Sequence, residues 1–218
     1  MAKQPVVGWV HEPLGAILSS RAKVAVLRIL WRASSAIPYR EVVRRSGMAY
    51  GSINLALGEL TNTGLVEELA GGRERRVRLR SGHRLAAALG NLLQVESDFF
   101  VSFRIELRTA AQGCESLGLL SAALIGPVAR REEMLGGTID LLMIAKDAAS
   151  MKRCVEHLGT MEDSLLTRYG VSLKVIAYDL ATARAMWRTR TPAAERGVNE
   201  AELLVGAPLA GLLETHDS

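Results

Sequence analysis

Residues 39–80 restrict the fold of this chain more than any other stretch. They begin with YREVVRRSG, a short helical pattern that ends in a tight turn at Gly47. The next part, MAYGSINLALGELTNTGLVEEL, has apolar residues at spacings of three and four. This spacing predicts a second helix whose buried face consists of Ile53, Ala56, Leu57 and Leu60.

A two-stranded hairpin is predicted after the second helix. Gly64 ends the helix, and residues 65–69 and 77–80 have the composition of strands. Gly71 and Gly72 open the loop between the strands, and the residues that follow are rich in arginine. A loop of this kind can lie along phosphates or enter a minor groove through its cationic side chains, which are Arg73, Arg75 and Arg76.

Polar residues at the start of the second helix lie off its buried stripe. A helix in the major groove presents such groups to base edges, and an asparagine amide can pair with adenine. Less specific interpretations remain open: Asn54 is solvated, Ser52 caps the helix or touches phosphate, and Tyr50 packs on the first helix.

With the phrase LTNTGLV, this order of helix, turn, helix and basic hairpin resembles the winged helix-turn-helix of bacterial and archaeal transcriptional regulators. The resemblance covers residues 15–82 and implies double-stranded DNA as a partner. The candidate DNA-binding residues are Arg40, Tyr50, Ser52, Asn54, Arg73, Arg75 and Arg76.

The distribution of charge agrees with a basic N-terminal domain, here called the head, joined to a mildly acidic remainder of the chain. Residues 1–82 hold 13 Lys and Arg against 6 Asp and Glu, a net charge of +7, while residues 83–218 hold 14 against 17, a net of −3. No apolar run approaches the roughly 20 residues that span a bilayer, and the N-terminus lacks a signal-peptide core, so we expect a cytoplasmic protein without a membrane partner. The isolated Cys114 and Cys154 are expected to be reduced, and the scattered histidines predict neither a metal site nor a cofactor.

Two further helices are predicted around the head. The segment RAKVAVLRILWRA follows a serine N-cap, Ser19 or Ser20, and its basic residues are expected on a solvated face: Arg21, Lys23, Arg28 and Arg32. Residues 83–112 predict a long amphipathic helix, interrupted or continuous near Ser97, with Glu96 as its one polar intruder. This helix is either a linker that docks on its own domains or the element that forms a homodimer.

Strands and helices alternate from Gly113 onward, which predicts a small mixed sheet. Strands are expected near 122–125, 139–144 and 171–177, and helices over 149–169, 180–188 and 201–213. The predicted fold class is therefore α+β. It has three parts: a winged-helix domain at 1–82, a linking or dimerisation helix at 83–112, and an α/β domain at 113–218.

The last domain resembles the minimal branch of the polymerase-β-type nucleotidyltransferases. That family carries Gly-Ser after one strand, then Ala-Arg-Gly-Glu, then Ser-Asp-x-Asp entering the next strand, and this chain has Gly126-Pro127, Ala129-Arg130-Arg131-Glu132 and Gly137-Thr138-Ile139-Asp140. The resemblance implies a two-metal site built on clustered carboxylates.

Here the motif is degenerate. Pro127 has neither an N–H nor a hydroxyl for phosphate, Thr138 replaces a carboxylate, and the third carboxylate position is expected at Lys174 or Ser172. Gly126 and Asp140 are then vestiges of the site, and no catalytic residue or metal ligand is predicted. Arg130, Arg131 and Lys174 could still bind a nucleotide or another anion.

The sequence thus predicts a DNA-binding transcriptional regulator whose nucleotidyltransferase-like domain is inactive and serves in sensing, partner binding or dimerisation. The alternative is an active Mg²⁺-dependent nucleotidyltransferase that its winged helix directs to a target.

Overall fold

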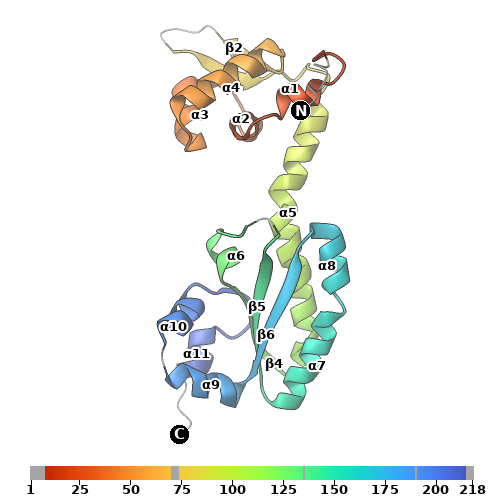
Figure 1. Ribbon diagram of the computed structural model, residues 1–218, viewed down its shortest axis with the longest axis vertical. Helices are drawn as coiled ribbons and strands as arrows, with labels where there is room; N and C mark the ends of the chain where they lie inside the picture. Colours follow the sequence, from red (N-terminus) through yellow and green to blue (C-terminus); the bar gives the residue numbers. More distant parts are fainter. Residues whose placement is uncertain (1–7, 70–73, 135, 190, 215–218) are drawn as a thin grey trace, which may run out of the picture. The chain divides into compact units, whose positions relative to one another are not determined.

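The computed structural model describes residues 8–69, 74–134, 136–189 and 191–214, which form a mixed α+β fold with two sheets (Figure 1). The chain divides into two compact units, Met1–Ser97 and Asp98–Ser218. The helix α5 (Ala86–Gly113) contributes residues to both units. Among the described residues, no helix is both long enough and apolar enough to cross a membrane.

The first unit combines helices with a small antiparallel sheet of strand order β1-β3-β2. The helix-turn-helix consists of α3 and α4, and the β2–β3 hairpin after it forms a wing. In chain order the elements are α1 (Pro13–Ile17), α2 (Arg21–Trp31), β1 (Ile37–Pro38), α3 (Tyr39–Ser46), α4 (Tyr50–Asn62), β2 (Val66–Leu69) and β3 (Arg76–Leu79).

Local sequence signals explain where these elements begin and end. Ser20 caps α2 because its hydroxyl accepts a hydrogen bond from the Lys23 backbone N–H, and Gly47 ends α3 in the left-handed conformation at φ 62°. The predicted buried stripe of α4 is confirmed, with all four of its residues in the core. The strand β1 was not predicted, because two residues are too few to show a period.

The basic face predicted for α2 is wrong at one position. Lys23 is buried, with 5% of its surface exposed, although its side chain is charged. The other basic residues of α2 are more exposed, and Arg28 forms an ion pair with Glu96 of α5. Glu96, the one polar residue in the apolar pattern, is therefore paired with an arginine of the first unit.

The helix α5 is continuous through Ser97 and alternates between buried and exposed stretches. Leu89 and Leu93 join the core of the first unit, while Phe103 and Leu107 join the core of the second. Between them, residues 94–102 are all exposed. Leu92 and Phe99, which follow the same apolar spacing along α5, remain on the surface of the described chain.

The second unit is built on a four-stranded mixed sheet of order β6-β5-β4-β7, in which β5 and β6 are parallel and the other pairs are antiparallel. One face packs against α5, α7 and α8, and the other against α9, α10 and α11, so helices cover both sides of the sheet (Figure 1). The elements are β4 (Leu119–Ile125), α6 (Pro127–Arg130), β5 (Thr138–Ala145), α7 (Ala148–Gly159), α8 (Glu162–Tyr169), β6 (Ser172–Asp179), α9 (Leu180–Arg188), α10 (Pro192–Asn199), β7 (Glu202–Gly206) and α11 (Leu209–Glu214).

Two sequence predictions in this unit are corrected. Residues 149–169 form two helices rather than one, because Thr160 and Met161 interrupt the helical hydrogen bonding between α7 and α8. Residues 201–213 were predicted as helix, but Glu202–Gly206 is the strand β7, and only Leu209–Glu214 is helical. The short apolar run LLVG does not distinguish a strand from a buried helix by its period.

Candidate nucleic-acid interface

The helix α4 presents its first two turns to solvent on the side opposite its buried stripe. Tyr50 is its first residue and is 61% exposed, and Ser52 and Asn54, which directly precede and follow the buried Ile53, are also exposed. The N-cap residue of α4 is Ala49, and no side-chain hydrogen bond caps this end of the helix. These three predicted site residues therefore lie on one end of one helix.

A cluster of side chains connects this end of α4 to α3 and to the wing. The Tyr39 hydroxyl donates a hydrogen bond of 2.5 Å to Asn54 Oδ1, and the Tyr50 ring lies 5.9 Å from the Tyr39 ring, centroid to centroid. The Arg75 guanidinium lies over the Tyr39 ring at 5.1 Å. Burial, followed by the neighbouring Tyr50, raises the pKa of Tyr39, so its hydroxyl remains a donor at neutral pH.

Tyr39 is a site residue that sequence reasoning missed. Its bond to Asn54 occupies one of the two lone pairs of the amide oxygen and leaves the amide N–H groups and the second lone pair for another partner. The side chain of Asn54 is therefore oriented before any ligand arrives. A tyrosine fifteen residues upstream of an asparagine carries no local pattern that would have predicted this contact.

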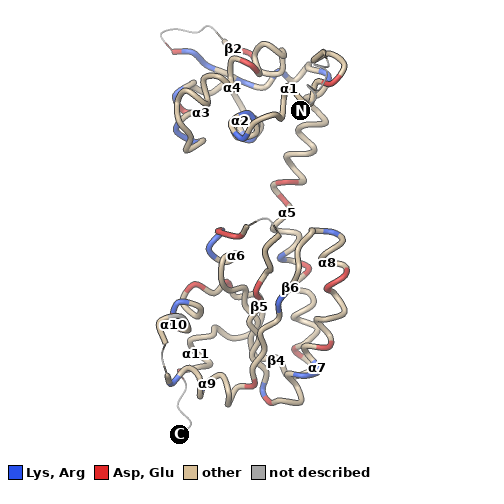
Figure 2. Tube along the Cα trace, viewed as in Figure 1, with Lys and Arg blue, Asp and Glu red and all other residues tan. Residues whose placement is uncertain are grey.

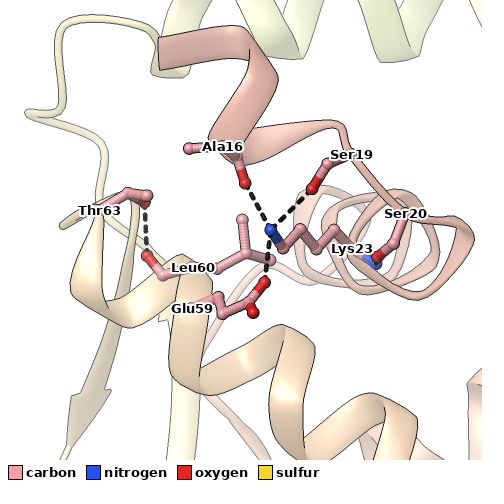
Figure 3. A network of polar contacts seen from close by, with 7 residues as sticks. All are labelled: Ala16, Ser19, Ser20, Lys23, Glu59, Leu60 and Thr63. Atoms are coloured by element: carbon pink, nitrogen blue, oxygen red, sulfur yellow. Dashed lines mark hydrogen bonds and ion pairs between the residues drawn. The ribbon is translucent and has the colours of Figure 1, made fainter. Parts of the chain in front are cut away.

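The buried Lys23 fixes the other end of α4 (Figure 3). Its ammonium donates to the Ala16 carbonyl at 2.6 Å and to Ser19 Oγ at 2.9 Å, and it pairs with Glu59 of α4 at 2.5 Å. One charge thus joins α1, the turn before α2, and α4. Because three oxygens surround it, the ammonium can be buried without losing its hydrogen bonds.

Arginines gather on α3 and on the wing (Figure 2), but each of those that the structure describes has a carboxylate or carbonyl partner. Arg40, which is 85% exposed, pairs with Glu74 at 2.6 Å, and Arg75 pairs with Glu68 at 2.5 Å. Other pairs on the same elements are Arg44 and Arg45 with Glu41, and Arg78 with Glu67. The side-chain bonds from Arg44 and Arg45 lower the pKa of Glu41 to about 2, so this carboxylate stays ionised at neutral pH.

The predicted wing arginines have different environments. Arg76 donates two hydrogen bonds to the Ala36 carbonyl, at 2.6 and 3.2 Å, and so braces the wing against the strand β1. Arg75 faces both Glu68 and the Tyr39 ring. Arg73 lies outside the described residues.

The structure also places the residues that carry the resemblance to nucleotidyltransferases. Asp140 of β5 is the register partner of Ile125 on one side and of Lys174 on the other. Gly126 follows β4 with φ 71°, and a Cβ there would come within 3.1 Å of Asp140 Oδ2. Gly126 and Asp140 therefore lie side by side, and Lys174 is the neighbour of Asp140 on the adjacent strand.

No carboxylate cluster surrounds Asp140. Thr138 is two positions before it on β5, and its register partner is Ser172. In the part of the chain that the structure describes, no group of three or more His, Cys, Asp or Glu side chains could hold a metal ion. Asp140 Oδ1 is buried and accepts no hydrogen bond from the described residues.

The predicted anion ligands are not brought together. Arg130 lines a hollow of about 480 Å³ with Gly126 and Arg196, but it pairs with Glu132 at 2.8 Å and with Glu200 at 3.1 Å. Arg131, an exposed residue at φ 60°, is not among the lining residues of this hollow, and neither is Lys174. Two carboxylates thus compete with an anion for Arg130.

No protein-family model matches this chain, and no curated protein matches it. Among solved structures, the chain is similar to an NMR structure from Mycobacterium bovis: the homodimeric winged helix-turn-helix DNA-binding domain, fragment 1–100, of Mb0332, which is described as a possible ArsR-family transcriptional regulator. The match covers 46% of this chain and 95% of that chain, with 19% sequence identity and a TM-score of 0.33. This similarity is too weak to assign the chain to that family.

Proposed function

We propose that this protein is a transcriptional regulator that binds double-stranded DNA through its first unit. The observation that carries the proposal is the exposed end of α4, where Tyr50, Ser52 and Asn54 project from a helix whose opposite stripe is fully buried. The arginines of α3 and of the wing flank it in sequence and in the fold, as phosphate contacts would. In this arrangement α4 reads bases and the arginines hold the backbone.

The local contacts are consistent with base contacts from α4 and phosphate contacts from the arginines. Tyr39 orients the Asn54 amide, and Arg76 braces the wing, so both elements keep their shape without DNA. Contacts that are organised in advance lose less conformational freedom on binding. The paired carboxylates Glu41, Glu68 and Glu74 would have to give up their arginines to phosphate, which lowers the non-specific affinity of the free protein.

The test is selection of bound fragments from randomised duplex DNA by the full chain, followed by anisotropy titrations. We expect one enriched sequence, bound about 10³-fold or more tightly than random duplex at the same salt concentration. The double change Ser52→Ala and Asn54→Ala should abolish the enrichment, while Arg153→Ala, on the exposed surface of α7, should leave it intact. A protein that enriches no sequence and binds no duplex at low salt would contradict the proposal.

For the second unit we propose a nucleotidyltransferase-like fold that no longer transfers nucleotides. The support is the ligand set: Asp140 has Lys174 as its strand neighbour, and Pro127 and Thr138 occupy the positions of a serine and an aspartate. Two divalent ions need several hard oxygen ligands, and a lysine beside Asp140 opposes the binding of even one ion.

Incubation of the full chain with labelled nucleoside triphosphates and Mg²⁺ or Mn²⁺ tests this part. We expect no label to be transferred to DNA, RNA or the protein itself. Transfer that is lost in Asp140→Ala and kept in Asp163→Ala would show an active nucleotidyltransferase instead, because Asp163 is a carboxylate of α8 outside the strand motif.

A further inference from the structure

The second unit contains a pocket of about 390 Å³ with an unusual wall. The sequence has only three phenylalanines, Phe99, Phe100 and Phe103, and all three line this pocket from α5. Tyr169, at the end of α8, provides a fourth ring. We call this site the aromatic pocket, defined by these four rings together with Glu133 and Met134 from the segment before β5.

The rings are held in fixed mutual positions. Tyr169 meets Phe99 edge to face at 5.3 Å and 78°, and meets Phe103 at 5.4 Å and 72°. The Tyr169 hydroxyl donates a 2.5 Å hydrogen bond to Glu106 Oε1, which restricts the position of the Tyr169 ring. Contacts within the protein thus hold these rings in place, yet Phe99 and Phe100 remain 45% and 36% exposed.

Charge inside the aromatic pocket has one sign. Glu133 is the only charged residue among those that line it, and it forms no ion pair with any described residue. The nearby Arg168 is already engaged, because it pairs with Glu106 at 2.8 Å and lies over the Tyr169 ring at 5.7 Å. Nothing in the described wall thus neutralises the Glu133 carboxylate.

We propose that the aromatic pocket binds a small organic cation that carries an aromatic or quaternary ammonium group. The faces of aromatic rings are negative and attract such cations, and a carboxylate at the rim adds a charge that a neutral or anionic molecule cannot use. The volume lies within the range of small-molecule sites and suits one ligand of about drug-fragment size.

Calorimetric titration of the full chain with three naphthalene compounds tests the proposal. The probes are naphthylmethyl-trimethylammonium, naphthalenemethanol and naphthaleneacetate, which share one ring system and differ in charge. We expect saturable binding of the cation, about tenfold weaker binding of the alcohol, and no measurable binding of the anion. No DNA is present, so the outcome is independent of whether the first unit binds DNA.

Variants then locate the site. Glu133→Gln should weaken the cation about five- to tenfold and leave the alcohol unchanged, whereas the control Glu132→Gln should change neither, because Glu132 faces Arg130 and does not line the pocket. Phe99→Leu keeps apolar bulk but removes a ring, and should also weaken the cation severalfold. Equal binding of all three compounds, no saturable binding of the cation, or equal effects of the two glutamate variants would overturn the proposal.

Discussion

At the residue scale, the buried Lys23 and its partner Glu59 show how one charge connects several helices of the first unit. The ammonium is buried among three oxygens, whereas the Glu59 side chain is 45% exposed and can be hydrated on its own. The two partners are therefore not equivalent. Removing Glu59 leaves a buried cation without a counter-charge, whereas removing the Lys23 charge leaves a carboxylate that water can solvate.

We expect Glu59→Ala to destabilise the protein by about 1–3 kcal/mol, because the Lys23 ammonium then has two neutral acceptors and no counter-charge. Lys23→Met should cost less than about 1 kcal/mol, because it replaces the buried charge by an apolar chain of similar length. Urea unfolding followed by circular dichroism measures both. A larger loss for Lys23→Met than for Glu59→Ala would show that the hydrogen bonds of Lys23, rather than its charge pairing, hold the helices.

If the first unit binds DNA as proposed, Asn54 is the residue best suited to a base-specific contact, because its amide can pair bidentately with adenine. We expect Asn54→Ala to weaken the enriched DNA site by about 1–3 kcal/mol and to change random duplex little. Tyr39→Phe removes the hydroxyl that orients the amide and should cause a smaller loss of the same kind. Anisotropy titrations on both DNAs measure this, and equal losses on the two would reduce Asn54 to a backbone contact.

At the scale of elements, the arginines of the wing are the proposed phosphate contacts, and those that the structure describes already have partners within the protein. Arg75 is paired with Glu68 on the adjacent strand, so the free wing is less positive than its arginine content indicates. We expect Arg75→Ala with Arg76→Ala to weaken specific and random DNA alike and to flatten the log–log salt dependence by up to about two units, roughly one per lost phosphate contact.

Glu68→Gln provides the opposite change in the same element. It frees Arg75 and removes a negative charge from the hairpin that we propose binds DNA, so affinity for random duplex should rise severalfold at low salt. Glu156→Gln on α7 is the matched control, since its partner Lys152 lies in the second unit. An unchanged salt slope in the arginine variant, or no gain from Glu68→Gln, would mean that the wing points away from DNA.

The strand β7 shows a backbone constraint that apolar patterning does not reveal. Gly206 ends it at φ 83°, and a Cβ there would come within 2.1 Å of the Leu120 carbonyl oxygen on β4. Gly206→Ala should therefore strongly destabilise the second unit. Gly197→Ala, in α10 with open space around it, should not. Thermal unfolding of the two variants compares them directly, and equal melting temperatures would contradict the close approach.

Sequence reasoning predicted features that follow from the period of a single element, and it missed those that depend on residues from several elements coming together. The buried face of α4 follows from its own spacing, because helix geometry alone places those four residues on one side. The burial of Lys23 depends on contacts with Ala16, Ser19 and Glu59. The motif left Lys174 and Ser172 as alternatives beside Asp140, and only the strand register identifies Lys174 as its neighbour. Neither arrangement is encoded in a local pattern.

On the scale of the whole molecule, α5 raises the question of what covers its exposed residues. Leu92 is 55% exposed and Val95 is 64% exposed, three positions apart on one side of the helix. Single apolar residues on a surface are ordinary, but adjacent ones on a helix shared by both units suit an interface. We propose that this side of α5 forms a homodimer, which would place two heads on one DNA.

Two heads on one DNA make the second contact intramolecular, which raises affinity without any new base contact. We expect the full chain to sediment as a dimer at micromolar concentration, and Val95→Glu to shift it to monomer and to weaken the enriched site by at least tenfold. Leu166→Glu, which alters an equally exposed leucine of α8, should leave both properties unchanged. A wild-type protein that is monomeric at micromolar concentration would remove the dimer, and a dimer that survives Val95→Glu would move its interface to another face.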